Sequence, residues 1–174
     1  YKIFASNGIL FNHESPWRSE NFVTKKIVTG LVDIKFGNSR KLKLGNIYSK
    51  RDWGYAKDYV EGMWKILQFK KPDDFVLATN KSISVKDFIN LILKKLKMKG
   101  YWKGKGLKEV FVFQKKIIIE IDKKYFRPAE VNFLKGSFSK AYRDLKWRPK
   151  TDISKLADIM VNYELEQLKK KKLK

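Results

Sequence analysis

The chain has 174 residues, no cysteine, one histidine and a formal net charge of +22. The lack of cysteine excludes disulfides, thiolate catalysis and Cys-ligated zinc, and one histidine cannot build a His-rich metal site. The sequence has no secretory signal pattern and no apolar run of membrane-spanning length. These features favour a protein of the reducing cytoplasm with no metal site and no membrane partner.

The positive charge raises the alternative of a non-enzymatic protein that binds nucleic acid or another polyanion. Lys far outnumbers Arg, however, and the Lys residues are spread over the expected helix surfaces and the tail. Such a spread is typical of a compositional bias that fills solvated faces with Lys, so we expect no nucleic-acid partner. A positive surface would still attract a phosphorylated small ligand.

Extended runs alternate with segments of helical periodicity, which predicts an α/β fold. We expect strands at 2–6, 41–44, 74–79, 110–113 and 116–121, and helices at 21–36, 55–68, 85–98, 137–145 and 153–168. Segment 99–106 is expected to form a loop or an edge strand, and segment 168–174 a frayed end. The expected strands are too few for a complete doubly wound sheet. We therefore expect the chain to be part of a longer protein.

Side-chain caps are expected at three of these helices, and Asp152 is expected to cap the helix at 153–168. Ser19 or Asn21 can cap the helix at 21–36, and Ser82 or Ser84 can cap the helix at 85–98.

The first of four unusual polar segments runs from Asn7 to Arg18 and contains the single histidine, His13. We expect it to form a loop between a strand and a helix, where α/β proteins place ligand sites. Neighbouring polar groups can fix the tautomer of His13, and Arg18 can meet a phosphate or an amide. A loop histidine that is hydrogen-bonded to backbone explains His13 equally well.

Three further segments favour a phosphorylated ligand. The opening turn of the helix at 21–36 offers free backbone N–H groups to an anion. Arg51 stands beside an aromatic residue in an expected loop, which suits a phosphate or a stacked base. Arg127 can grip a diphosphate while Glu130 accepts hydrogen bonds from ribose hydroxyls. Helix capping and local ion pairs remain the alternatives, and no segment carries a Gly-rich dinucleotide loop, a Walker loop or a nucleophile elbow.

Several motifs occur together in a defined order and spacing. They are NGILFNHESP at 7–16, ENFVT at 20–24, KRDWG at 50–54, AKDYVE at 56–61, YFRPAEV at 125–131 and LKWRP at 145–149. From Tyr1 to about Leu168 the sequence resembles the GDP-mannose 4,6-dehydratase family of extended short-chain dehydrogenases/reductases. The motif Asn-His-Glu-Ser-Pro is quite specific to this family among enzymes of sugar nucleotides.

The resemblance implies that residues 1–174 form the C-terminal portion of a sugar-nucleotide dehydratase. The expected fold is the last strands of an NAD(P)-binding Rossmann fold, interleaved with a smaller mixed α/β substrate-binding domain. The family's dinucleotide loop, its Tyr-x-x-x-Lys pair and its dehydration residues would lie upstream of Tyr1. We therefore expect no catalytic residue in the chain and no turnover by the chain alone.

The activity implied by the resemblance converts GDP-mannose to GDP-4-keto-6-deoxymannose, with loss of water and transient hydride transfer to NADP. It is the first step toward GDP-fucose and related deoxyhexoses. The family's full-length enzymes are usually homodimers or homotetramers. Another extended short-chain dehydrogenase/reductase of a sugar nucleotide, such as an epimerase or a reductase, is the nearest alternative.

The resemblance also assigns site residues. The cofactor-binding positions are Leu10, Asn12, His13 and Arg18, and the substrate-binding positions are Asn21, Val23, Thr24, Lys26, Arg51, Arg127 and Glu130. The segment from Asn21 to Lys26 corresponds to a helix start that holds GDP, the two arginines at 51 and 127 lie on the diphosphate side, and Glu130 accepts from ribose. Trp17, Tyr55 and Asn132 depart from the residues usual in the family.

Overall fold

The computed structural model describes residues 3–126 and 131–172 and divides the chain into two compact units. Unit 1 comprises residues 1–15, 50–83 and 133–156, and unit 2 comprises residues 16–49, 84–132 and 157–174. Each unit therefore collects segments that are far apart in the sequence. In the described segments, no helix has both the length and the apolar character needed to cross a bilayer.

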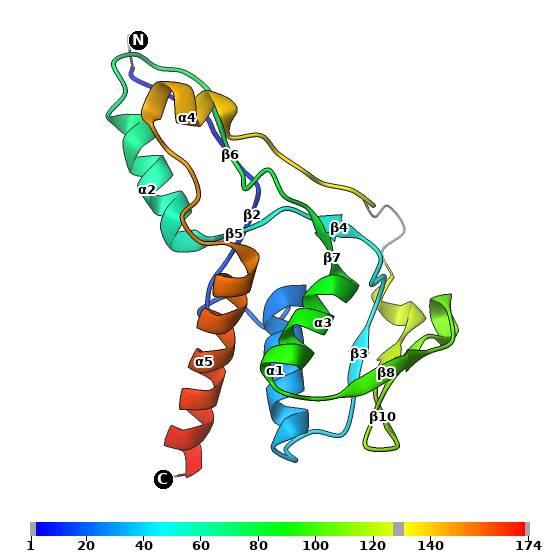
Figure 1. Ribbon diagram of the computed structural model, residues 1–174. Helices are drawn as coiled ribbons and strands as arrows, with labels where there is room; N and C mark the ends of the chain where they lie inside the picture. The colour runs from blue at the N-terminus through cyan, green and yellow to red at the C-terminus, as the bar shows by residue number, and fades with distance from the viewer. Residues whose placement is uncertain (1–2, 127–130, 173–174) are drawn as a thin grey trace. The chain divides into compact units, whose positions relative to one another are not determined.

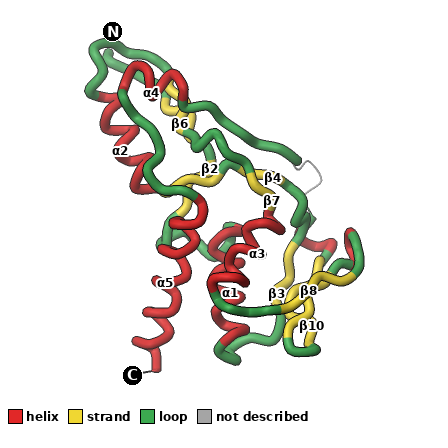
Figure 2. The backbone as a smooth tube through the Cα atoms, viewed as in Figure 1, coloured by secondary structure: helices red, strands yellow, loops and turns green. Residues whose placement is uncertain are grey.

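Unit 1 is built on pairs of short parallel strands, drawn yellow in Figure 2. Its elements are β1 (Gly8–Leu10), β2 (Asn12–Glu14), β4 (Lys50–Arg51), β5 (Trp53–Tyr55), β6 (Phe75–Leu77), α2 (Ala56–Leu67) and α4 (Ser139–Leu145). β1 pairs with β6 and β2 pairs with β5, both in parallel. β4 pairs with β7 (Ile83–Ser84), where unit 1 ends.

The core of unit 1 forms where α2 and α4 pack against β6 (Figure 1). Trp147 follows α4 and is 1% exposed, and its ring meets the ring of Tyr59 edge-on with centroids 5.8 Å apart. The indole Nε1 of Trp147 donates a hydrogen bond of 2.8 Å to the carbonyl oxygen of Asp58. A buried tryptophan needs such a polar partner, so the segment after α4 is fixed to the first turn of α2.

A glycine in α2 makes this close packing possible. A Cβ atom added at Gly62 would lie 2.6 Å from Leu77 Cδ1 and 3.0 Å from Trp147 Nε1. Leu77 is fully buried and Trp147 nearly so, and side chains in a close-packed core cannot shift freely. The sequence therefore uses glycine inside a helix, despite its low helix propensity, to let the helix approach the strand.

Gly62→Ala should destabilise the protein by about 1–3 kcal/mol, because an overpacked core must shift its side chains. The measurement is the denaturant midpoint of unfolding. Lys57→Ala, at an exposed position of the same helix, is the control and should leave the midpoint nearly unchanged. An unchanged midpoint for Gly62→Ala would contradict this account of the core.

Unit 2 contains a four-stranded mixed sheet and two packed helices. Its elements are α1 (Val23–Lys35), β3 (Leu42–Leu44), α3 (Val85–Lys95), β8 (Gly100–Lys103), η1 (Gly106–Lys108), β9 (Val110–Phe113), β10 (Lys116–Ile121), η2 (Lys123–Tyr125) and most of α5 (Ile153–Lys172). The strand order is β3-β10-β9-β8, with the β3–β10 pair parallel and the others antiparallel. α1 packs against α3 through the fully buried Ile27, Leu31, Phe88 and Ile89.

A buried carboxylate ties α3 to the segment that precedes β9. Glu109 is 2% exposed and accepts hydrogen bonds from Tyr48 Oη and, at 2.6 Å, from Lys86 Nζ. Burial raises the pKa of the Glu109 carboxyl, but the hydrogen bonds from Lys86 and Tyr48 lower it, and the net pKa lies below the ordinary value of 4.5. The ionised form of Glu109 therefore stabilises the folded state.

Because the folded-state pKa of Glu109 is depressed, its contribution is complete above pH 4.5 and is lost as pH falls through the folded pKa. Glu109→Gln should lower stability at pH 7 and reduce the further loss of stability as the pH falls below 4.5. Thermal unfolding across this range measures both effects. Glu166→Gln, at an exposed position of α5, is the control, and equal acid sensitivity of wild type and Glu109→Gln would refute the assignment.

The structure confirms most of the expected elements. β9 and β10 have the predicted bounds, and β8 confirms an edge strand within 99–106. The capping prediction is confirmed at α3, where Ser84 and Asp87 form a capping box. It is wrong at α1, where Phe22 is the N-cap and makes no side-chain hydrogen bond.

Three other expectations are wrong. Residues 3–6 form no strand; the strand begins at Gly8, where the backbone meets β6, and Ile3 remains 72% exposed. The expected loops at 7–16 and 50–55 contain β1, β2, β4 and β5, which are too short to show a periodicity of their own. α5 continues as a helix to Lys172 instead of fraying from Leu168.

Candidate functional site

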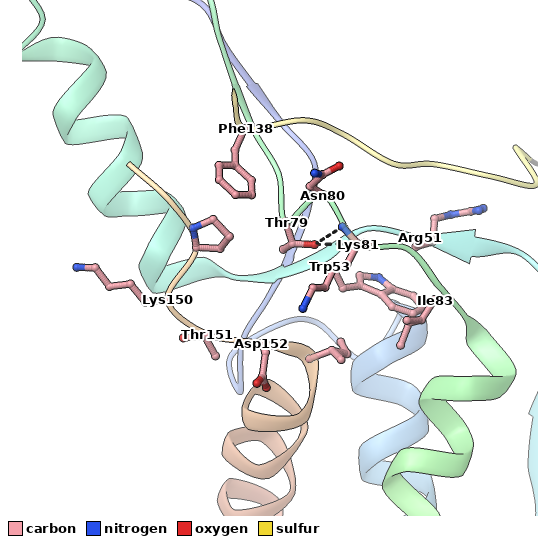
Figure 3. Close-up of a pocket in the computed structure, with 12 residues that line it drawn as sticks. Arg51, Trp53, Thr79, Asn80, Lys81, Ile83, Phe138, Lys150, Thr151 and Asp152 are labelled. Atoms are coloured by element: carbon pink, nitrogen blue, oxygen red, sulfur yellow. Dashed lines mark hydrogen bonds between the residues drawn. The ribbon is translucent and has the colours of Figure 1, made fainter. Parts of the chain in front are cut away.

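Unit 1 contains a cavity of about 400 Å³, shown in Figure 3. It is lined by Arg51, Trp53, Thr79, Asn80, Lys81, Ile83, Phe138, Pro149, Lys150, Thr151, Asp152 and Ile153. In Figure 3, Arg51 stands at one end of this group and Lys150 at the other. The predicted residue Arg51 therefore borders a cavity whose size falls in the usual range for small-molecule sites.

The walls of this cavity are held by Asp52, which lies between β4 and β5 and is fully buried. Its Oδ1 accepts hydrogen bonds from the backbone N–H of Thr79 at 2.8 Å and from the hydroxyl of Thr79 at 2.6 Å. Its Oδ2 accepts from the backbone N–H of Gly136 at 3.2 Å. The alternative of a surface ion pair at this segment does not hold for Asp52, which is a buried link between three chain segments.

The turn after β6 is fixed by the same contacts. The Thr79 hydroxyl also accepts from the backbone N–H of Lys81 at 3.2 Å, and Asn80 adopts a left-handed conformation with φ 58°. Asn80 tolerates this conformation better than most residues do. Lys81 is thereby presented at the cavity wall (Figure 3).

The cavity lining has an excess of positive charge. The lining contains three basic residues, Arg51, Lys81 and Lys150, and one acidic residue, Asp152, whose Oδ1 accepts from the backbone N–H of Lys155 at 2.8 Å. The ammonium of Lys150 is partly neutralised by Glu61 at 2.5 Å. The balance of charge suits an anionic ligand.

His13 lies in strand β2, which corrects the expected loop. Its Nδ1 is 2.9 Å from the carbonyl oxygen of Phe11, and its ring stacks on Tyr59 with centroids 5.0 Å apart and an interplanar angle of 26°. A carbonyl oxygen only accepts, so Nδ1 carries the hydrogen and the neutral ring keeps its lone pair on Nε2. Burial, with the nearby Asp52 and Asp58, raises the pKa of Tyr59 far above its ordinary range.

Unit 2 contains a second cavity of about 440 Å³. It is lined by Glu20, Asn21, Lys26, Thr29, Gly30, Asp33, Leu42 and Tyr125. Two of the predicted substrate residues, Asn21 and Lys26, are therefore brought together at one wall. The ammonium of Lys26 lies over the ring of Tyr125, 3.7 Å from its centroid.

The other predicted residues of unit 2 have different surroundings. Val23 is half-buried and Thr24 is fully buried in the first turn of α1. The guanidinium carbon of Arg18 lies 3.5 Å from the centroid of the Phe22 ring. Lys25 is engaged by the carbonyl oxygen of Pro16 at 2.7 Å and by Glu164.

In unit 1, Leu10 packs against the hydrophobic core and Asn12 is half-buried in β2. Arg127 and Glu130 lie outside the described residues. Within the described ranges, no group of three or more His, Asp or Glu side chains could hold a metal ion.

Sequence reasoning missed several cavity residues of unit 2. Thr29 and Asp33 continue the helix face that begins with Lys26, at spacings of three and four residues. That spacing was visible in the sequence, but a polar helix face is more often solvated than part of a cavity. Tyr125, at the end of η2, belongs to a motif of the family resemblance but was not expected at this cavity.

The chain has the fold of the NAD(P)-binding extended short-chain dehydrogenases/reductases. It is similar to the structure of RMD from Pseudomonas aeruginosa complexed with NADPH, with a TM-score of 0.75 and 17% identity. That likeness covers 92% of this chain and 48% of the other chain. The α/β fold class predicted from the sequence is confirmed.

The family is defined by sequence. The family model described as GDP-mannose 4,6 dehydratase matches residues 1–160. GDP-mannose 4,6 dehydratase 1 of Arabidopsis thaliana is 49% identical over 177 residues, covering 99% of this chain and 44% of that protein. GDP-mannose 4,6 dehydratase of Drosophila melanogaster is 46% identical over 172 residues, covering 98% of this chain and 44% of that protein.

The chain belongs to the GDP-mannose 4,6-dehydratase family. It spans a little under half the length of the curated relatives it matches.

Asp52→Asn should lower the stability of unit 1 by about 2–4 kcal/mol, because an amide nitrogen would then face the N–H of Gly136 or of Thr79 inside a buried site. The measurement is the unfolding midpoint in urea. Asp144→Asn, at an aspartate on α4 that pairs with exposed Arg143, is the matched control and should give a much smaller shift. Equal shifts for the two variants would show that Asp52 does not link these segments.

Proposed function

We propose that the complete protein carrying this chain converts GDP-mannose to GDP-4-keto-6-deoxymannose with NADP as cofactor. The observation that carries the proposal is the family match over residues 1–160. Within that match, three residues assigned to substrate from the sequence, Asn21, Lys26 and Arg51, line cavities of the two units. Their placement at cavity walls supports a role in binding, which the family match alone does not give.

The cavity of unit 2 is assigned to the nucleotide. α1 begins at Val23 beside this cavity, and the N-terminus of a helix favours an anion through its free N–H groups and its dipole. Lys26 adds a positive charge in the same turn. Asn21 offers an amide that can both donate and accept.

Arg51 is assigned to the diphosphate. Its planar guanidinium can bind two phosphate oxygens at once, which a lysine cannot do. Arg51 lines a cavity with more basic than acidic residues, which supports this role. Arg127 and Glu130, expected at the diphosphate and the ribose, complete the proposed substrate set.

Leu10, Asn12, His13 and Arg18 are assigned to the cofactor. Leu10 ends β1, and Asn12 and His13 follow in β2, so the three lie at the carboxyl end of β1, a position where α/β folds bind nucleotides. The hydrogen bond from Nδ1 of His13 to the carbonyl oxygen of Phe11 leaves Nε2 as a hydrogen-bond acceptor, so the residues present fit a polar cofactor group. NADP would supply the oxidant that accepts a hydride from the sugar and returns it.

Residues 1–174 would form the C-terminal, ligand-orienting portion of this enzyme, with the reacting side chains supplied elsewhere in the complete protein. Holding reactants in the correct orientation lowers the activation barrier substantially, because the entropy cost of bringing them together is met on binding. A homodimer or homotetramer in the cytoplasm, expected from the sequence, belongs to the same proposal.

The direct experiment incubates the complete protein with GDP-mannose and NADP and follows the 4-keto-6-deoxy product by mass spectrometry. The proposal predicts loss of one water and no product from UDP- or dTDP-sugars. Conversion of a UDP- or dTDP-sugar in preference to GDP-mannose would favour another extended short-chain dehydrogenase/reductase. Binding that has no preference for GDP and falls steeply with salt would favour a polyanion-binding protein.

Arg51→Ala should weaken GDP-mannose binding by about tenfold to a hundredfold, the usual value of a charge-assisted hydrogen bond. Isothermal titration of the complete protein measures it. Arg40→Ala, at an exposed arginine of unit 2 that lies off both cavities, is the matched control and should bind as wild type. Unchanged binding by Arg51→Ala would remove Arg51 from the substrate site.

A further inference from the structure

One face of α1 forms the long wall of the unit 2 cavity. Lys26, Thr29, Gly30 and Asp33 follow one another at helical spacing, and all four line the cavity. At Gly30 an added Cβ atom would lie 2.9 Å from Leu42 Cδ1, so the missing side chain lets β3 approach the helix closely. The wall therefore has polar side chains toward both ends and no side chain at Gly30 between them.

The charge along this wall changes sign. The end near the start of α1 carries Lys26 and the positive end of the helix dipole, and the carboxylate of Glu20, just before α1, also lines the cavity. The far end carries the carboxylate of Asp33, seven residues and therefore about 10 Å further along the helix axis. A ligand that lies along the wall can place an anionic group beside Lys26 and hydrogen-bond donors beside Asp33.

The Asp33 carboxylate has unused acceptor capacity. In the part of the chain that the structure describes, one side-chain hydrogen bond reaches it, from Asn38 Nδ2 at 3.5 Å. An ionised carboxylate can accept about four. Between Asp33 and Lys26, the Thr29 hydroxyl oxygen is buried and has no hydrogen-bond partner among the described residues.

A nucleoside diphosphate has an anionic end and an end with hydrogen-bond donors, which match Lys26 and Asp33. The phosphates of a nucleoside diphosphate supply the anionic end, and the base supplies the other end. A carboxylate is satisfied best by two adjacent donors that it can accept in parallel. Among the common bases, guanine offers such a pair, N1–H and the 2-amino group, whereas adenine and the pyrimidines do not present two adjacent N–H donors from ring and amino group.

We propose that Asp33 selects guanine by accepting hydrogen bonds from N1–H and the 2-amino group, with the diphosphate directed toward the Lys26 end of α1. The inference rests on the proposed function, because it takes a nucleotide sugar as the ligand of this cavity. Beyond the proposed function, the inference names Asp33 as the residue that determines base specificity and states which way the nucleotide lies along α1. Asp33 is a binding residue and takes no part in bond breaking.

The test compares GDP with IDP, whose hypoxanthine base lacks the 2-amino group and keeps N1–H. Isothermal titration of the complete protein gives the ratio of the two dissociation constants. Wild type should bind GDP about tenfold or more tightly than IDP, since one charge-assisted hydrogen bond separates the two ligands. In Asp33→Asn and Asp33→Ala the ratio should fall toward one.

Two controls separate base recognition from general charge. Asp158→Asn makes the same charge change on α5, where Asp158 pairs with Lys95 and lies off the cavity, and should keep the wild-type ratio. Glu20→Gln changes the other carboxylate of the cavity lining and should keep it as well. Circular dichroism confirms that each variant is folded before titration.

The outcomes distinguish the two claims. If wild type binds GDP-mannose and the GDP-to-IDP ratio is the same in wild type and both Asp33 variants, the inference about Asp33 is wrong and the proposed function stands. A ratio that collapses in Glu20→Gln but not in the Asp33 variants would also overturn it. If wild type binds neither GDP nor GDP-mannose, the proposed function itself fails.

Discussion

The buried carboxylate of Asp52 is the constraint on which unit 1 depends. Burying a charge is costly unless every part of it is hydrogen-bonded, and Asp52 meets this condition through Thr79 and the backbone N–H of Gly136. It thereby joins the strand segment at 50–55, the turn after β6 and the segment that leads to α4. Arg51 and Trp53, on either side of Asp52, line the cavity as a consequence.

The elements predicted well are those whose signal is local. β9 and β10 are apolar runs bounded by turn residues, and the start of α3 carries Ser84 with Asp87 three residues later. β1, β2 and β5 have three residues each, and each is defined by a parallel partner about 40 to 70 positions away, as in the pairing of His13 with Gly54. A three-residue strand has no periodicity of its own, so its pairing cannot be predicted from the sequence.

Some residues of the candidate sites could likewise be predicted from the sequence, and others could not. Asn21, Lys26 and Arg51 were predicted from residue type and family resemblance, and each lines a cavity. The burial of Asp52 could not be predicted, because an aspartate beside an arginine is usually part of a surface pair. Asp33 was missed for a related reason: it lines a cavity together with Leu42 and Tyr125, which are far from it in the sequence.

The central claim is that the chain orients a nucleotide sugar for a dehydration in which the cofactor carries a hydride between two carbons of one sugar. GDP-mannose labelled with deuterium at C4 tests it most directly, with the complete protein and NADP. The account predicts that the keto product carries the deuterium at C6. A keto product with no deuterium at C6 would contradict the account.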